Sequence, residues 1–301
     1  MADLKNPKLA IPVVLMAGIF WSFGPYVVRN IDEANTVPWQ YLFTRGLVIF
    51  ILLNAYLFME EGISFFNNYK KIGISGVVGG SGLAIAMITF IWSITNTTAA
   101  ITLLCLAAMP FITALLGFLF LKETISTNVW VAIAIATIGI LIMALGNHEK
   151  NTLMGFILGI TSAIGFSIFS VSLRWRKETP KFTTVSIAGF ICVVVSLIVI
   201  INKDLSLISS SKNQTLFALH GTIVCLGMIL YAIASKNIPA AELTLLSLTE
   251  VIGGIFWVWL PLFGINEVPD TNTVIGGFFL FISLFYYSLI MRWNKRYIGL
   301  N

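Results

Sequence analysis

Long apolar runs separated by short polar segments are the main pattern of the chain. No Asp, Glu, Lys or Arg occurs in residues 72–121, a stretch long enough for two membrane-spanning helices of about 20 residues each. Six further charge-free runs are each long enough for one span: 9–28, 124–147, 151–173, 182–202, 213–235 and 271–291. These runs alone predict eight spans.

Two more runs contain only isolated charges. Residues 38–59 are interrupted by Arg45, and residues 240–263 carry Glu242 and Glu250. Because the runs are almost continuously apolar rather than alternating, they favour helices over a membrane barrel. The pattern therefore predicts an all-α integral membrane protein with ten transmembrane helices. The first run has the length of a span and lacks a small-residue cleavage pattern, so we interpret it as the first helix and not as a secretion signal.

Composition agrees with this class of protein. Of the 301 residues, 58% are hydrophobic and only 10% are charged, and the mean hydropathy is +0.94, which excludes a soluble domain. Three cysteines, Cys105, Cys192 and Cys225, fall within predicted helices without metal-binding or redox spacing, so we expect buried free thiols. We expect no cofactor and no metal.

Positive residues are distributed unevenly between the two sets of connections. Thirteen belong to one set: Lys5, Lys8, Lys70, Lys71, Lys122, Arg174, Arg176, Lys177, Lys181, Lys236, Arg292, Lys295 and Arg296. The opposite set holds only Arg29, Lys150, Lys203 and Lys212. Since positive connections stay in the cytoplasm, this predicts a multi-pass protein of the inner (plasma) membrane with both termini cytoplasmic. The net charge of +5 follows from this asymmetry, so we do not expect nucleic-acid binding.

The two halves of the chain repeat each other. Residues 89–104 align with residues 230–246 at an offset of 141, which places Phe90 on Tyr231. Residues 18–29 align with residues 163–174 at an offset of 145. The sequence therefore predicts two five-helix repeats, 1–150 and 151–301. Because five is odd, the second repeat enters the membrane from the opposite side. Such inverted repeats commonly form a transport pathway between them. The alternative is a duplicated bundle without a transport function.

Four stretches carry a resemblance to a known family: "FWSFGPYVVR", "WQYLFTRGLVIF", "LLCLAAMPFITALLGFLFLKETIS" and "LLSLTEVIGGIFWVWLPLFGINEVPD". The chain resembles the drug/metabolite transporter superfamily, specifically its EamA-like family. The resemblance implies a ten-helix transporter and export more often than import. The family pattern in the fourth and ninth helices is Leu-Glu-Pro, but here Met109 replaces the acid before Pro110, and Val251 replaces the proline after Glu250.

Glu250 is the most informative polar residue. It lies ten residues into its predicted helix, about 15 Å from the start and near the membrane midplane. A carboxylate at this depth costs about 3 kcal/mol or more, so it must face protein or water. Ser247, Glu250 and Gly254 share one helical face. Proton coupling, substrate contact and a structural pairing all remain open for Glu250. A dry site disfavours the charged form of its carboxyl group, whereas a nearby cation favours that form.

Arg45 is the only Lys or Arg well inside a predicted helix. We interpret it as structural, in an ion pair or a contact with a helix carbonyl. Anion recognition stays open, because guanidinium groups bind carboxylates through two hydrogen bonds.

Other candidates come from repeated positions. Ser22 and Ser167 share a polar stripe on the first and sixth helices, and Phe90 and Tyr231 are equivalent aromatic residues. The predicted substrate-binding or proton-coupling residues are Glu250, Ser247, Trp21, Ser22, Tyr26, Phe90, Ser93, Phe166, Ser167 and Tyr231. Core packing is the alternative for each aromatic residue.

Glu123 and Glu267 end the fourth and ninth helices in equivalent turns, where we expect them to cap the next helix or bind a nearby backbone amide.

The chemistry available narrows the function. No GxxxxGK[ST] phosphate loop is present. The two histidines, His148 in a loop and His220 at a helix start, have no acidic cluster nearby in the sequence, so an intramembrane enzyme is not expected. We predict a secondary active transporter, with export favoured, of a small organic metabolite such as an amino acid, working by alternating access with proton coupling. A flippase or transporter for a lipid-linked substrate is the alternative.

The expected partners are a small-molecule substrate and the lipid bilayer. The chain is expected to be a monomer or a homodimer, because Gly139, Gly276 and Gly277 in the last helix of each half suit either a dimer contact or internal packing.

Overall fold

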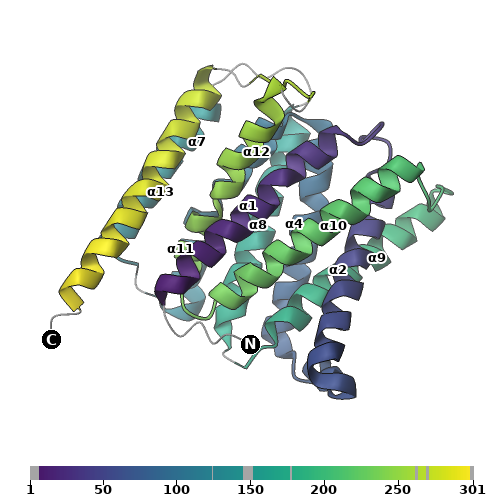
Figure 1. Cartoon of the computed structure of the whole chain (residues 1–301), viewed down its shortest axis with the longest axis horizontal. Coiled ribbons are helices and arrows are strands. Elements are labelled where there is room, and N and C mark those ends of the chain that lie inside the picture. Colours follow the sequence, from purple (N-terminus) through teal and green to yellow (C-terminus); the bar gives the residue numbers. More distant parts are fainter. Residues whose placement is uncertain are drawn as a thin grey trace.

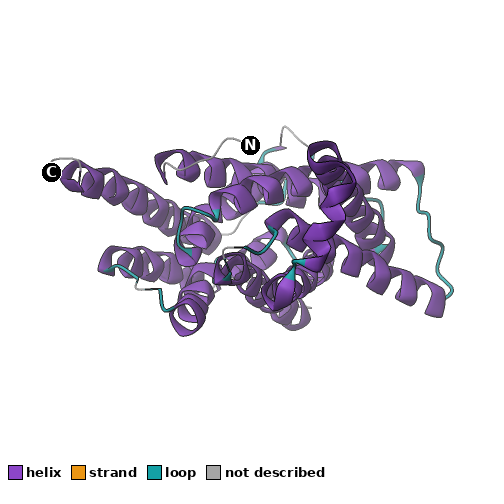
Figure 2. Cartoon of the chain, turned by 90° about the horizontal axis from the view of Figure 1, so that it is seen from below, coloured by secondary structure: helices purple, strands orange, loops and turns teal. Residues whose placement is uncertain are grey.

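The computed structural model describes residues 7–123, 125–144, 152–176, 178–261, 264–268 and 271–298. Within these ranges the regular structure is helical and contains no strand (Figures 1 and 2). The predicted boundary between residues 150 and 151 lies outside the described residues, as does His148. The division into two repeats therefore stays a prediction.

The first half of the chain follows the predicted runs closely. Its elements are α1 (Pro7–Arg29), α2 (Pro38–Glu61), η1 (Gly62–Phe65), α3 (Phe66–Lys70), α4 (Gly73–Asn96), α5 (Ala99–Leu106), α6 (Met109–Leu116), η2 (Gly117–Leu121) and α7 (Thr127–Ala144). The second half contains α8 (Thr152–Trp175), α9 (Lys181–Asn202), α10 (Ser211–Ala234), α11 (Ala240–Ser247), α12 (Thr249–Trp259) and α13 (Thr271–Ile298).

Helix length and hydropathy support a multi-pass membrane protein. Among the described residues, eight helical stretches are long and apolar enough to cross a membrane. Two shorter apolar stretches, Thr127–Ile142 and Val274–Tyr287, belong to α7 and α13. The total of ten spans therefore stays a prediction.

The fourth and ninth predicted helices are each interrupted, which a continuous apolar run did not indicate. The fourth breaks at Ala107 and Ala108, just before Pro110, which has no N–H to continue the helical ladder. The ninth breaks at Leu248 without a proline. There the hydroxyls of Thr244, Ser247 and Thr249 all donate to carbonyls in the preceding turn, which competes with regular helical bonding.

Glycines bring helices of the two halves into backbone contact. A Cβ at Gly82 of α4 would lie 2.9 Å from the carbonyl oxygen of Gly165 in α8, and one at Gly46 of α2 would lie 2.8 Å from that of Gly189 in α9. Such close approach gives the two halves a common core.

The pair formed by α7 and α13 stands apart from the main bundle at the left of Figure 1. A Cβ at Gly139 of α7 would lie 2.6 Å from the carbonyl oxygen of Gly276, so these two glycines serve packing inside the chain. A Cβ at Gly277 would meet no atom within 4 Å. Whether the chain is a monomer or a homodimer stays a prediction.

An arginine clamp closes one end of the bundle, which we call the Arg29 end. Arg29 Nε lies 2.8 Å from Glu267 Oε2, and its other nitrogens donate to the carbonyl oxygens of Ile94 and Thr97 at 2.9 and 2.8 Å. Glu267 Oε1 also accepts from the backbone N–H of Ala99 at 2.9 Å. The Arg29 clamp therefore ties the ends of α1 and α4 to the turn after α12.

The same arrangement occurs at the other end, the Arg174 end. Arg174 Nε lies 2.6 Å from Glu123 Oε1, and Arg174 Nη1 donates to the carbonyl oxygens of Ser235 and Ile238 at 3.0 and 2.7 Å. Glu123 Oε2 accepts from the backbone N–H of Ala240 at 3.3 Å. The two glutamates thus bind backbone amides as expected, but at the start of α5 and α11 rather than in the next helix.

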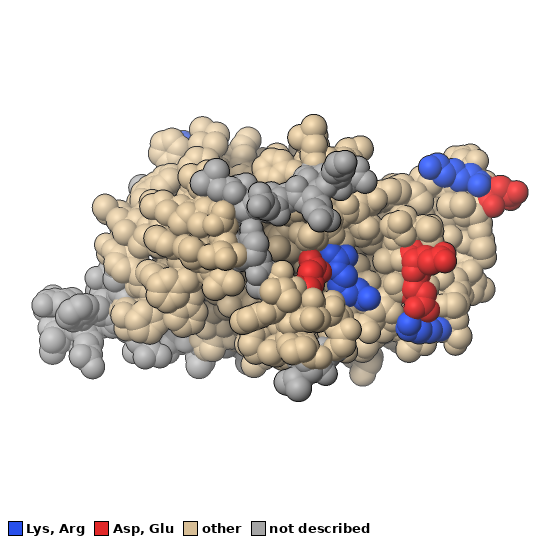
Figure 3. Space-filling view, turned by 90° about the horizontal axis from the view of Figure 1, so that it is seen from above, with Lys and Arg blue, Asp and Glu red and all other residues tan. Residues whose placement is uncertain are grey.

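Figure 3 looks onto the upper end of the view in Figure 1, where α1 ends. Uncharged side chains cover most of this surface, and the charged ones gather in a few small groups. Two ion pairs belong to this end, Arg29 with Glu267 and Lys212 with Asp32.

Candidate functional site

A small central hollow lies between helices of both halves. Its volume is about 60 Å³. Its wall is formed by Trp21, Arg45, Leu83, Ala86, Met87, Phe90, Leu106, Met109, Ser162, Phe166, His220, Val224, Met228 and Glu250. The wall is mostly apolar, with one arginine, one glutamate, one histidine and one serine as its polar members.

Two opposite charges face this hollow from different halves. Arg45 comes from α2 and Glu250 from α12, and no ion pair within 4.0 Å joins them among the described residues. Arg45 Nη2 donates to the carbonyl oxygen of Met87 at 3.1 Å, and the guanidinium carbon lies 5.8 Å from the centre of the Tyr41 ring. Arg45 Nε is buried without a hydrogen-bond partner. The predicted carbonyl contact of Arg45 is present, and part of its guanidinium is left for another acceptor.

The break at Leu248 positions Glu250. Instead of lying deep within a continuous helix, Glu250 is the second residue of α12. The positive end of the helix dipole favours a carboxylate there. Ser247 is fully buried, and its Oγ donates to the carbonyl oxygen of Thr244 at 2.8 Å, while Gly254 packs near Leu103. Of the predicted strip of Ser247, Glu250 and Gly254, only Glu250 belongs to the wall of the hollow.

His220 is a wall residue that the sequence did not reveal. Its Nδ1 is hydrogen-bonded to the Tyr41 hydroxyl, and the Tyr41 ring stacks on Phe217 with 4.8 Å between centres. Gly24 makes room for the imidazole, since a Cβ there would lie 2.9 Å from His220 Nε2. Tyr41 and Gly24 are far from His220 in the sequence, so no local spacing could indicate these contacts.

Aromatic rings form one side of the hollow. Trp21 and Phe166 meet edge to face with 5.5 Å between ring centres, and Phe90 also contributes to the wall. Tyr231 lies behind them, 5.4 Å from Trp21 and 5.3 Å from Phe166 between ring centres. Tyr231 is fully buried, and its hydroxyl forms a 2.7 Å hydrogen bond with Ser170 Oγ. Three of the five predicted aromatic residues, Trp21, Phe90 and Phe166, thus line the hollow.

The remaining candidates lie outside the wall. Ser22 donates to the carbonyl oxygen of Ile19 at 2.7 Å and accepts from Trp257 Nε1 at 2.9 Å. Ser167 donates to its own helix at Ala163, 2.8 Å away. Ser93 donates to the carbonyl oxygen of Gly155 at 2.8 Å, and Tyr26 is half-buried near the end of α1. The hydroxyls of the three serines are already used in helix packing.

The described residues contain no group of three or more His, Cys, Asp or Glu side chains that could hold a metal ion. Cys105, Cys192 and Cys225 are buried free thiols.

Comparison with known proteins adds family information to this geometry. Residues 8–145 match the EamA-like transporter family. An uncharacterized transporter of Helicobacter pylori is 24% identical over 265 residues, which cover 84% of this chain and 87% of the relative. The pseudopaline exporter CntI of Pseudomonas aeruginosa is 23% identical over 284 residues, covering 92% of this chain and 94% of the relative.

A solved crystal structure has the same fold. It superposes with a TM-score of 0.73 at 14% sequence identity, covering 95% of this chain and 99% of the other. At this identity the likeness concerns the fold alone.

Proposed function

We propose that this chain, whose residues 8–145 match the EamA-like transporter family, is a secondary active transporter of the drug/metabolite transporter superfamily that exports a small organic metabolite, such as an amino acid or a related compound. The observation that carries this proposal is the central hollow, where Arg45 and Glu250 face one space without forming an ion pair.

The chemistry of the wall supports a solute with both signs of charge. A carboxylate of the solute can accept from the guanidinium of Arg45, which has a buried Nε without a partner. An ammonium group of the solute can donate to Glu250. The rings of Trp21, Phe90 and Phe166 suit an apolar remainder.

The size of the hollow supports alternating access. About 60 Å³ is far below the roughly 300–1,000 Å³ of sites that hold small molecules, so the hollow is too small for an amino acid. The hollow must widen when the solute binds. Equivalent clamps at opposite ends and equivalent breaks in two helices are what two inverted repeats would supply for such a cycle.

Glu250 is the proposed coupling residue. A carboxylate that holds a proton loses its attraction for an ammonium group, so proton binding and solute binding at Glu250 exclude each other. A proton that enters from outside would thereby release the solute, and the deprotonated carboxylate would bind the next solute from inside. This competition couples proton entry to solute export.

The charge distribution gives the proposed orientation. Described positive residues at the Arg174 end include Lys70, Lys71, Arg174, Lys181 and Lys236, so this end is the cytoplasmic one in our proposal. Export is supported by the name of the Pseudomonas aeruginosa relative, which is an exporter of pseudopaline.

Untargeted mass spectrometry of growth medium and cell extract tests the proposal. Cells that express the wild type, Glu250→Gln or no transporter are compared at matched membrane levels. We expect a solute that accumulates in the medium of wild-type cells only. If the medium of wild-type cells equals that of cells without the transporter while lipid-linked compounds change, the small-metabolite proposal is wrong.

A further inference from the structure

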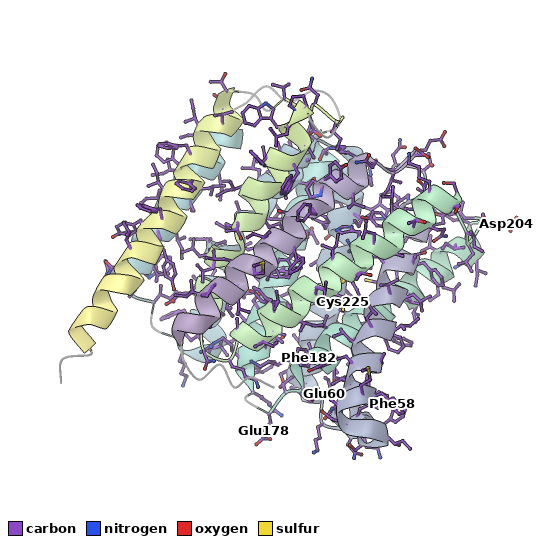
Figure 4. The ribbon with its side chains drawn as sticks, in the orientation of Figure 1. Phe58, Glu60, Glu178, Phe182, Asp204 and Cys225 are labelled. Carbon is purple, nitrogen blue, oxygen red and sulfur yellow. The ribbon has the colours of Figure 1, made fainter. Side chains whose placement is uncertain are left out.

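A second and much larger cavity opens at the Arg174 end. Its volume is about 970 Å³, and it lies between the ends of α2 and α10 and the start of α9. Its wall includes Tyr56, Glu60, Glu178, Lys181, Phe182 and Lys236. Figure 4 labels Glu60, Glu178 and Phe182 together at the lower end of the bundle, with Cys225 higher along α10. We call this cavity the vestibule.

The vestibule continues the axis of the central hollow. On α2, Arg45 lines the hollow and Tyr56 lines the vestibule about 16 Å further along, at 1.5 Å per residue. On α1, Trp21 lines the hollow and Val13 the vestibule, about 12 Å apart by the same rise. Since two helices show the same order, the two spaces lie one behind the other.

Three aromatic rings, Trp21, Phe166 and Tyr231, pack on one another where the two spaces approach each other along α10, and we call them the septum. Trp21 and Phe166 form part of the wall of the hollow. Tyr231 is fully buried against both rings, while its chain neighbours Leu230 and Ala232 line the vestibule. The Trp21 Nε1 group donates to the carbonyl oxygen of Val224 at 3.3 Å, which fixes the ring across the passage.

The opposite side of the hollow is covered differently. A buried cluster that includes Ile91, Ile94, Phe217 and Val258 lies there together with the Arg29 clamp. The hollow is therefore separated from the Arg29 end by packed side chains and an ion pair. Towards the Arg174 end lie the three rings of the septum and, beyond them, the vestibule, which is large enough for a small solute.

We propose that the vestibule is a loading site, where a small zwitterionic solute binds before it crosses the septum into the central hollow. This inference rests on the proposed transport function. The volume is in the range of about 300–1,000 Å³ that small-molecule sites occupy. The passage that the solute takes from the vestibule requires the Tyr231 ring to move away from Trp21 and Phe166.

The walls of the vestibule indicate the class of solute. Three carboxylates, Glu60, Glu61 and Glu178, and three amines, Lys71, Lys181 and Lys236, line it. Such a balance suits a molecule with both charges better than a polyanion or a polycation. The rings of Tyr56 and Phe182 meet edge to face at 5.7 Å and provide an apolar surface for the side chain of the solute.

Thiol labelling tests the septum without knowledge of the cargo. Cys105, Cys192 and Cys225 are replaced by alanine, and single cysteines are introduced as Ile233→Cys in the vestibule, where the side chain is half-buried, or as Met228→Cys in the hollow. A membrane-impermeant maleimide is applied to inside-out and right-side-out vesicles. We expect Ile233→Cys to react in inside-out vesicles, and Met228→Cys to react at least about ten-fold more slowly.

Tyr231 variants then show what the ring contributes. Tyr231→Ala is expected to raise the labelling rate of Met228→Cys by about ten-fold or more, whereas Tyr231→Phe, which keeps the ring and loses the bond to Ser170, raises it much less. The septum does not limit access to the hollow if the two cysteines are labelled equally fast with Tyr231 intact. The same conclusion follows if Tyr231→Ala has no effect on the labelling rate. If Ile233→Cys is labelled only in right-side-out vesicles, the placement of the vestibule is wrong. Each purified variant is first checked to be monodisperse, so that misfolded variants are left out of the comparison.

Protection against labelling tests the loading site itself. L-leucine is compared with 4-methylpentanoate, which lacks the ammonium group, and 3-methylbutylamine, which lacks the carboxylate. We expect leucine to slow the labelling of Ile233→Cys more than either analogue, also in Glu250→Gln, because Glu250 is not part of the vestibule. Equal protection by the three compounds, or protection by none, overturns the loading site. If leucine protects the cysteine and Glu250→Gln also transports like the wild type, the loading site is supported. Only the proposed proton coupling is then contradicted.

Discussion

Some side chains of the central hollow could be identified from the sequence, and others only from the folded chain. Arg45 and Glu250 could be found in the sequence because a charge in a long apolar run is conspicuous, and Trp21, Phe90 and Phe166 because repeated positions pointed to them. His220 could not be found in this way. Its partner Tyr41 belongs to a helix of the other half, and a sequence without a structure does not bring the two together.

The hydroxyl of Tyr41 gives a prediction at this scale. Tyr41→Phe removes the bond to His220 and loosens the ring under Arg45, so we expect a stability loss of about 1 kcal/mol and a several-fold drop in export rate. Thermal unfolding of the purified protein and the rate of solute efflux measure the two effects.

Tyr69→Phe is the matched control, since the Tyr69 hydroxyl donates to Asn54 Oδ1 at 2.7 Å, away from the hollow. It should cost similar stability and leave the efflux rate unchanged. Equal loss of efflux in both variants would refute a positioning role for Tyr41.

At the scale of helices, apolar runs predicted which segments are helical, but not where a helix breaks. Pro110 marks the break in the fourth helix. The break in the ninth depends on three hydroxyls that bond to nearby carbonyls, and such residues are also found within unbroken helices. Arg29 and Arg174 occupied equivalent positions in the sequence, but their glutamate partners become apparent only when the halves pack together.

Contact between α4 and α8 gives a prediction for helix packing. A methyl group at Gly82 would press on the Gly165 carbonyl and the Ile168 side chain, so Gly82→Ala should destabilise the protein by about 1–3 kcal/mol. Gly277→Ala adds a methyl group where no atom lies within 4 Å, and should change stability by less than about 1 kcal/mol. Thermal unfolding of both purified variants checks this, and equal stability of the two would argue against close packing of α4 on α8.

The clamps are expected to stabilise the ends as units. In a double-mutant cycle of Arg29→Gln and Glu267→Gln, we expect a coupling energy of about 1 kcal/mol, because both side chains are mostly shielded and the bond is short. The cycle of Arg174→Gln and Glu123→Gln should give a similar value. Unfolding midpoints in detergent provide the numbers, and coupling near zero in both cycles would mean that the clamps do not stabilise the ends.

The whole molecule combines features that the sequence predicted with features that need three dimensions. Hydropathy and the positions of charged residues indicated a multi-pass helical membrane protein, because the membrane imposes that pattern on each span separately. The difference between a hollow of about 60 Å³ and a vestibule of about 970 Å³ arises from the way helices of both halves pack. No single helix carries that information.

Proton-coupled export through Glu250 is the central claim, and the pH dependence of transport tests it most directly. Uptake of the solute identified by mass spectrometry is measured in inside-out vesicles with an imposed proton gradient, for the wild type, Glu250→Gln and Glu242→Gln. Glu242 is the matched control, since it is an embedded carboxylate that accepts a hydrogen bond from Tyr287 outside the hollow. We predict that gradient-driven uptake is lost in Glu250→Gln and retained in Glu242→Gln. Uptake by Glu250→Gln with the rate and pH dependence of the wild type would contradict the claim.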